Sequence, residues 1–218
     1  MQSTSETDNL LVISYLTLRK AIGLLGIALP FIISIGALLL FQTGLQDSIS
    51  NYYYTCMRNV LVGILCAIGV FLLSYKGYER KDELAGDFGC AFAVGVALFP
   101  TRPPGSTSSL AATIGIFHFI FAASFFLTLS YFSLFLFTKT DPEGVPTRRK
   151  LQRNKIYKVC GFTMVMCLLL ILIEGRLPNE LRESLKAYHP VFWLESIAVV
   201  AFGISWLTKG EAILSDET

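Results

Sequence analysis

Five ionisable residues lie inside or beside the apolar stretches that dominate this chain of 218 residues: Arg58, His118, Glu174, His189 and Glu195. A charged side chain in hydrocarbon is costly, so such residues usually face the interior of a helix bundle or an aqueous cavity. Histidine and carboxylate exchange protons or bind metals, and arginine binds anionic groups. These five residues are therefore the first candidates for a functional site.

Apolar helices must position these residues. The chain is 53% hydrophobic and 16% charged, against about 45–50% and roughly 25% in ordinary soluble domains. Crossing a bilayer takes about 17–25 apolar residues. Six stretches have this character: 21–42, 59–75, 84–101, 110–138, 156–175 and 190–208. The sequence predicts an all-α fold, a polytopic integral membrane bundle of six transmembrane helices.

The placement of Lys and Arg predicts the orientation, because these residues concentrate in cytoplasmic segments. Most of them fall on one side: Arg19, Lys20, Lys76, Arg80, Lys81, Arg148, Arg149, Lys150, Arg153, Lys155 and Lys209. The opposite loops carry fewer. We expect a multi-pass protein of the cell membrane with both termini in the cytoplasm. It would comprise an N-terminal segment at 1–20, a transmembrane domain at 21–208 and a tail at 209–218.

Counting along the predicted helices places the ionisable residues at the non-cytoplasmic end. At 1.5 Å per residue, His118 lies about 12 Å and Glu195 about 8 Å inside the membrane. We expect these two residues, entering on different helices at similar depth, to share one buried site. Asp87, near the opposite end of the third stretch, is expected to have a structural role, with Lys155 and Lys158 as candidate partners.

The sequence predicts an outward-opening polar cavity at this end. Its expected ligand-binding residues are Arg58, Asn59, His118, Glu195 and Tyr54, of which Arg58 would hold an anionic headgroup. Tyr54 ends a run of three tyrosines, a residue type that often lies at headgroup depth. The expected partners are membrane lipids and a small amphiphilic ligand.

Two other functions stay open, and with them the question of whether the chain is an enzyme. One is a metal-dependent intramembrane hydrolase of a lipid substrate, with His118, His189 and Glu195 around zinc. His189 and Glu195 are six residues apart, roughly 120° around a helix, so a zinc site would need three segments. The other is a proton-coupled carrier of small molecules in which Glu195 and His118 titrate.

The sequence contains no motif for several other functional classes. The chain has no HExxH, GxSxG or Walker sequence, which disfavours those routes to hydrolysis and ATP use. The basic run from Arg148 to Lys155 lies in a short loop, so we read it as a topology signal with some attraction for anionic lipid and expect no nucleic-acid partner. The small residues of 84–101 predict the most enclosed helix.

Short stretches of the chain resemble two known families. The stretch His118-Phe-Ile-Phe-Ala122-Ala-Ser-Phe125-Phe126, with Trp193-Leu-Glu195, resembles the six-helix family of DRAM-type autophagy modulators and GPI-lipid-remodelling proteins. Small bacterial membrane proteins of this layout are similar around Ser50-Asn-Tyr-Tyr-Tyr-Thr-Cys-Met-Arg58-Asn59. This resemblance implies lipid-linked roles.

The second resemblance is to the alkaline ceramidase and adiponectin-receptor-type membrane hydrolases. It implies seven helices and a histidine-rich zinc site. This chain departs from that pattern, with six predicted spans and with Trp193 four residues after His189 in place of a second histidine.

Overall fold

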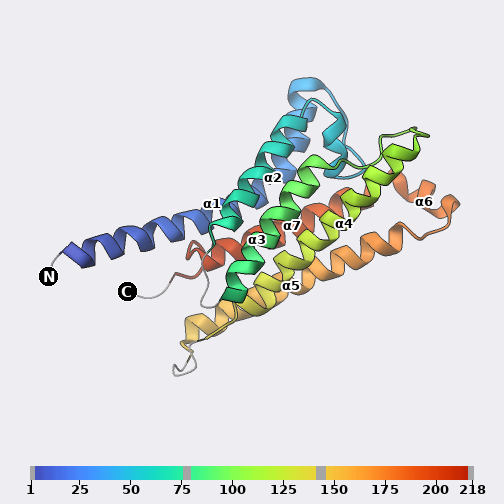
Figure 1. Ribbon diagram of the computed structural model, residues 1–218. Helices are drawn as coiled ribbons and strands as arrows, with labels where there is room; N and C mark the ends of the chain where they lie inside the picture. The colour runs from blue at the N-terminus through green and yellow to red at the C-terminus, as the bar shows by residue number, and fades with distance from the viewer. Residues whose placement is uncertain (1–2, 76–79, 141–145, 216–218) are drawn as a thin grey trace.

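The computed structural model describes residues 3–75, 80–140 and 146–215, with side chains from residue 15 onward except that of Lys81. All regular elements in these ranges are helical (Figure 1). They are α1 (Ser3–Phe41), the 3₁₀ helix η1 (Ser50–Tyr54), α2 (Arg58–Leu73), α3 (Arg80–Leu98), α4 (Ser109–Tyr131), the π-helix η2 (Phe132–Leu136), α5 (Arg148–Glu174), α6 (Asn179–Lys186) and α7 (Pro190–Lys209). The predicted all-α class is thereby confirmed.

Four helices are long and apolar enough to cross a membrane: Tyr15–Phe41 within α1, Ser109–Leu136 over α4 and η2, α5, and α7. Each of the six predicted stretches overlaps one of the helices α1, α2, α3, α4, α5 and α7. α2 has 16 residues, about 24 Å at 1.5 Å per residue, and the first turn of α3 carries Asp82 and Glu83. A membrane protein is indicated, while the crossing of the bilayer by α2 and α3 stays a prediction.

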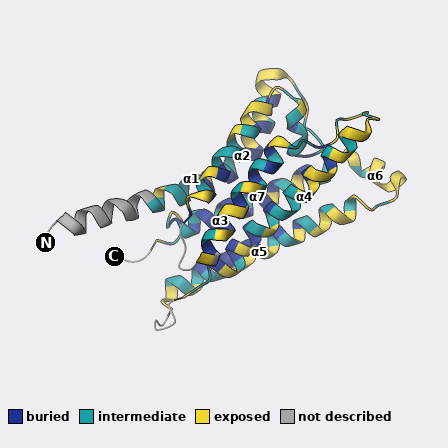
Figure 2. Ribbon diagram, in the orientation of Figure 1, coloured by how far each residue is buried: buried dark blue, intermediate teal, exposed yellow. Residues whose placement is uncertain are grey.

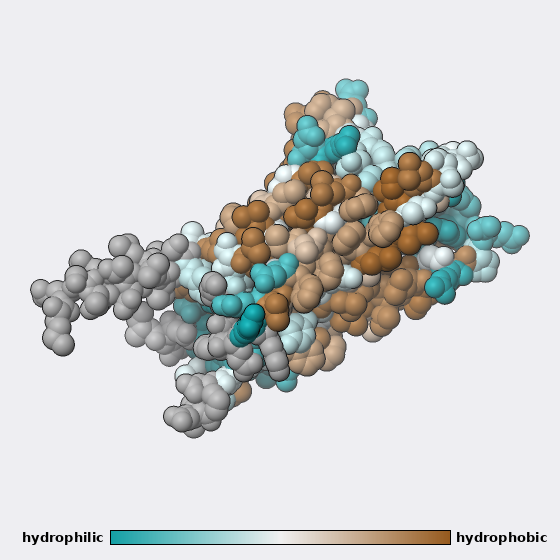
Figure 3. Space-filling model, in the orientation of Figure 1, coloured by the Kyte–Doolittle hydropathy of each residue, from teal (hydrophilic) through white to brown (hydrophobic). Residues whose placement is uncertain are grey.

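The helices run side by side, and the two described ends of the chain lie at the same end of the bundle (Figure 1). We call this the termini end, where α1, α3 and α5 begin and α2, η2 and α7 finish. The opposite end, the η1 end, is formed by residues 42–57, 99–108 and 175–189. Apolar side chains cover much of the middle of the visible face, and hydrophilic side chains gather toward the ends (Figure 3).

α7 is the most enclosed of the candidate spans, whereas the sequence favoured the third stretch. It packs against α1 and α5 and buries ten residues, among them Phe192, Phe202 and Trp206. α2, α4 and α5 instead show many exposed residues on their outward faces (Figure 2). Small residues allow the close approach, because a Cβ added at Gly203 of α7 would lie 2.6 Å from the carbonyl oxygen of Gly23 in α1.

Local sequence explains where several helices begin. Ser108 caps α4 by accepting the backbone N–H of Ala111 at 3.4 Å, and Thr147 caps α5 by accepting that of Lys150 at 3.1 Å. Pro190 begins α7, where its fixed φ fits the first helical turn. These helices therefore begin at residues with a clear capping or conformational preference.

Two helices differ from the sequence prediction. α1 begins at Ser3, so most of the predicted segment 1–20 is the first part of this helix. α6 was not predicted, because its eight residues are too few and too polar to show as an apolar stretch. Lys76 of the predicted orientation signal and the final residues 216–218 of the predicted tail lie outside the described residues.

An acidic residue is buried at the termini end, but it is Asp82 and not Asp87. The Asp82 side chain is 2% exposed, and its Oδ1 lies 2.6 Å from Nζ of Lys139. Asp87 is exposed on α3, and no pairing with Lys155 or Lys158 is seen. Asp87 therefore has neither of its two candidate partners, since the side of α3 that faces the bundle could not be read from its weak hydrophobic pattern.

Candidate functional site

His118 is buried near the η1 end and uses both ring nitrogens. Nδ1 lies 2.7 Å from the carbonyl oxygen of Phe99, and Nε2 lies 3.0 Å from Oγ of Ser50. A carbonyl only accepts, so Nδ1 carries the proton; in the neutral ring, Nε2 then accepts the hydroxyl proton of Ser50. The imidazole thus ties α4 to the end of α3 and to η1.

Glu195 holds the start of the same 3₁₀ helix. Its Oε2 accepts the backbone N–H of Ile49 at 2.6 Å, and the backbone of Ser50 lies close to the same carboxylate. Ile49 is the N-cap of η1 and makes no capping bond with its own side chain, while the Ser48 hydroxyl accepts the backbone N–H of Asn51 at 3.0 Å. The carboxylate of α7 therefore adds a second cap, satisfying a donor that a helix start leaves free.

Asp47 fastens the loop between α1 and α2 to the start of α7. Its Oδ1 lies 3.1 Å from Nδ1 of His189, and its backbone carbonyl accepts the N–H of Phe192 at 3.0 Å. His189 has a φ of 48°, a left-handed conformation that is uncommon for residues other than glycine. The two contacts hold this unusual turn at the entrance to α7.

Two further contacts join η1 to the segment after α3. Oγ1 of Thr101 donates to Oδ1 of Asn51 at 3.0 Å, and the Tyr54 hydroxyl donates to the Thr101 carbonyl. Burial raises the pKa of Tyr54 above its ordinary value, so this phenol keeps its proton at neutral pH. Residues 47–54 are therefore anchored to α4, to α7 and to the α3–α4 connection.

Arg58 lies at the surface of this end. Its guanidinium stacks on the ring of Tyr53 with 4.1 Å to the centroid, and Nη2 donates to the Tyr53 hydroxyl at 2.5 Å. Asn59 beside it is exposed. Glu174, at the end of α5, lies 3.4 Å from Nε of Arg182 in α6. These three positions sit at the rim of the bundle, away from the buried contacts of His118 and Glu195.

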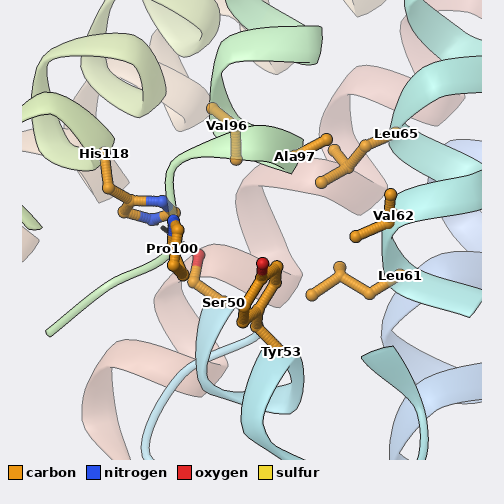
Figure 4. A pocket seen from close by; sticks show the side chains of 9 residues that line it. All are labelled: Ser50, Tyr53, Leu61, Val62, Leu65, Val96, Ala97, Pro100 and His118. Atoms are coloured by element: carbon orange, nitrogen blue, oxygen red, sulfur yellow. Dashed lines mark hydrogen bonds between the residues drawn. The ribbon is translucent and has the colours of Figure 1, made fainter. Parts of the chain in front are cut away.

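A small hollow lies between α2, α3 and η1 (Figure 4). Ser50, Tyr53 and His118 contribute its polar groups. The remaining lining is apolar: Leu61, Val62, Leu65, Val96, Ala97 and Pro100. The cavity itself has a volume of about 10 Å³, which is room for about one water molecule.

The structure separates the five expected ligand-binding residues. His118 lines the hollow; Arg58, Asn59, Tyr54 and Glu195 are not among its lining residues. Glu195 and His118 are nevertheless connected, because they bind the adjacent residues Ile49 and Ser50. Their shared feature is the first loop and not a common cavity wall.

The residues of the expected zinc site are not brought together. His118 contacts Phe99 and Ser50, His189 contacts Asp47, and Glu195 contacts Ile49. In the part of the chain that the structure describes, no group of three or more His, Cys, Asp or Glu residues is placed to hold a metal ion. The donor set therefore does not fit zinc, since a catalytic zinc needs about three protein ligands at one point.

Sequence reasoning missed Phe99 and Thr101, which contact the polar residues of this end. Phe99 acts through its backbone carbonyl, so its side-chain type gives no signal. Thr101 follows Pro100 at the end of an apolar stretch, a position where the helix must stop and its last polar groups need new partners. That local signal could have identified the segment after α3.

Comparison with known protein families, with curated proteins and with solved structures gives no match for this chain. The two resemblances drawn from the sequence therefore remain predictions.

Proposed function

We propose that this chain is an integral membrane protein that binds a lipid or small amphiphile at the η1 end. The observation that carries the proposal is the hollow of Figure 4, which has polar groups at one side and apolar walls elsewhere. An amphiphile has the same two parts. Its polar group would meet the hydroxyls of Ser50 and Tyr53, and its chain would contact α2 and α3.

Arg58 gives this end a means of binding an anionic headgroup. Its guanidinium is exposed, yet it is held in place by Tyr53, which itself lines the hollow. Stacking on a ring leaves the outer donors of a guanidinium able to form charge-assisted hydrogen bonds. The headgroup would therefore lie at the rim, about one side chain away from the apolar wall.

The size of the hollow restricts what it holds. A cavity of about 10 Å³ takes only a water-sized group, such as one polar group of a headgroup or the methyl end of a chain, and the rest of the molecule would lie along the outer surface of α2 and α3. Exposed apolar residues on these helices, such as Val70, Phe88 and Leu98, provide such a surface. We propose lipid handling of this partial kind, with six helices crossing the cell membrane and both termini in the cytoplasm.

Filling the hollow tests the proposal. Ala97 lines it and is 2% exposed, whereas Ala91 of the same helix is exposed. The probes are dioctanoyl phosphatidylglycerol and octyl glucoside, added to protein purified in a detergent with a bulky headgroup and followed by native mass spectrometry. Ala97→Leu should lower occupancy of at least one probe about tenfold, and the matched control Ala91→Leu should leave it unchanged. Equal occupancy in the two variants, with both proteins folded, would overturn the proposal.

A further inference from the structure

Four basic residues from three helices meet at the termini end, opposite the hollow. Arg19 comes from α1, Lys150 and Arg153 come from the first turns of α5, and Lys209 ends α7. Arg19, Lys150 and Arg153 all lie within electrostatic range of Lys209, together with the carboxylate of Glu211. We call these four basic residues the basic cluster. Its members are far apart in the sequence, so only the packing of α7 against α1 and α5 brings them together.

Direct contacts fix the positions of these side chains. Nζ of Lys150 donates to the carbonyl oxygen of Phe137 at 2.8 Å, and Nζ of Lys209 lies 5.6 Å from the centroid of the Phe137 ring. The two ammonium groups therefore approach the same residue, one at its backbone and the other at its ring. Nη1 of Arg153 lies 3.7 Å from Oε1 of Glu211.

Arg19 adds a donor that needs an acceptor. Its guanidinium lies 4.1 Å from the centroid of the Tyr15 ring and 5.8 Å from that of Tyr75. Its Nε is buried and has no hydrogen-bond partner among the described residues. A buried donor without an acceptor typically costs about 1–3 kcal/mol. A ligand that brings acceptor oxygens would remove that cost.

The surroundings strengthen the attraction for an anion. Behind the basic cluster lies a group of packed aromatic rings that includes Tyr75, Phe132, Phe137 and Trp206, whose neighbouring centroids are 5.0–5.8 Å apart. An apolar wall on one side lowers the local dielectric and concentrates the field of nearby charges. Like charges held together in this way repel each other, and an anion between them relieves that repulsion.

We propose that the basic cluster is a binding site for the phosphate group of an anionic phospholipid. The location argues for a lipid, because Arg19 and Lys20 directly precede the long apolar run of α1 and Lys209 is the last residue of the candidate span α7. Both positions fit the depth at which headgroups lie. Two guanidinium groups offer planar pairs of donors that match phosphate oxygens. Basic pockets between transmembrane helices bind anionic headgroups by this chemistry.

The first experiment compares lipids on the full chain purified in a nonionic detergent. Dioctanoyl phosphatidic acid, dioctanoyl phosphatidylcholine and inorganic phosphate are titrated separately, with binding followed by native mass spectrometry for the lipids and by competition for phosphate. Phosphatidic acid should bind at least about tenfold more tightly than phosphatidylcholine. Equal binding of the two lipids would overturn the proposal. If inorganic phosphate competes at the same concentration as the lipid, the ligand is free phosphate, and the proposal that the site binds a phospholipid is overturned.

The second experiment locates the site with variants. Lys209→Gln and Arg153→Gln should each weaken phosphatidic acid binding about fivefold, the effect of one basic contact near a membrane surface. Lys158→Gln is the matched control, because Lys158 is an exposed lysine of α5 outside the cluster. Lys209→Arg keeps the positive charge and should retain phosphatidic acid binding. It replaces Lys209→Gln in the comparison if that variant does not fold. A loss in Lys158→Gln as large as that in Lys209→Gln would show a general charge effect and overturn the site.

Discussion

Glu195 of the last helix accepts the backbone N–H of Ile49, 146 residues earlier in the chain, at 2.6 Å. This bond joins the loop between the first two helices to the centre of the bundle. It also caps η1, whose Ser50 binds His118 through its hydroxyl. Two ionisable residues predicted to share a cavity thus hold adjacent residues of one loop, and their effects on stability should be measurable.

Removing the carboxylate of Glu195 should destabilise the protein. Glu195→Ala leaves the Ile49 N–H without this acceptor, at a cost of about 1–3 kcal/mol. Glu195→Gln should cost less, because an amide oxygen still accepts the bond. Thermal unfolding in detergent measures both changes, with Glu183→Gln as a control whose side chain is 72% exposed on α6. Identical melting temperatures for wild type and Glu195→Ala would contradict the capping role.

Glu195 and His118 should be coupled in spite of having no direct contact. Each holds one of two adjacent residues, so loss of either bond frees the same loop and reduces the effect of losing the other. We expect the double variant Glu195→Ala, His118→Ala to lose about 0.5–3 kcal/mol less than the sum of the two single variants. Strict additivity in unfolding measurements would show that the two contacts stabilise independent parts of the protein.

The crossing of α1 and α7 should tolerate no added methyl group. A Cβ at Gly203 would lie 2.6 Å from the carbonyl oxygen of Gly23, which is backbone and cannot rotate away. Gly203→Ala should therefore cost about 1–3 kcal/mol through overpacking. Gly63 of α2 has open space around its Cβ position, so Gly63→Ala is the control and should be neutral or slightly stabilising. The melting temperatures of the two variants and of the wild type measure these effects. Equal melting temperatures for Gly203→Ala and Gly63→Ala would contradict the close approach of α1 and α7.

Asp82 and Asp87 should differ sharply in their contribution to stability. Asp82→Ala removes a carboxylate that is 2% exposed and pairs with Lys139. The Lys139 side chain is 33% exposed, so water can hydrate its charge in the variant. We therefore expect the free energy of unfolding to fall by about 1–3 kcal/mol, less than when a fully buried charge loses its partner. Asp87→Ala changes an exposed residue and should alter stability by less than about 0.5 kcal/mol. The reverse order would indicate a different packing of α3.

The proposed orientation can be tested by labelling single cysteines in intact cells. The five native cysteines, Cys56, Cys66, Cys90, Cys160 and Cys167, are first replaced by serine or alanine. Thr107→Cys, at the η1 end, should react with a membrane-impermeant maleimide, and Arg148→Cys, at the termini end, should react only after the cells are opened. Both positions are exposed. The opposite labelling pattern would show that the orientation in the membrane is the reverse of the proposed one, with the basic cluster at the outer surface.

The sequence by itself determined the helical class and the approximate positions of the long helices. Apolar stretches at 110–138 and 190–208 correspond closely to Ser109–Leu136 and Pro190–Lys209, because a run of apolar residues and a capping residue are local properties. Counting residues also indicated that His118 and Glu195 lie near one end, since the rise per residue of a helix is nearly constant.

Only the tertiary structure decided the partners of these residues. The hydrophobic residues of α3 and α7 form only a weak pattern around the helix, so the sequence could not indicate which side of α3 faces the bundle or that α7 would be the most enclosed candidate span. The backbone N–H of Ile49 and the carbonyl of Phe99 have no side-chain signature, yet they bind Glu195 and His118. The basic cluster likewise arises from three distant segments, which meet because α1 and α5 both pack on α7.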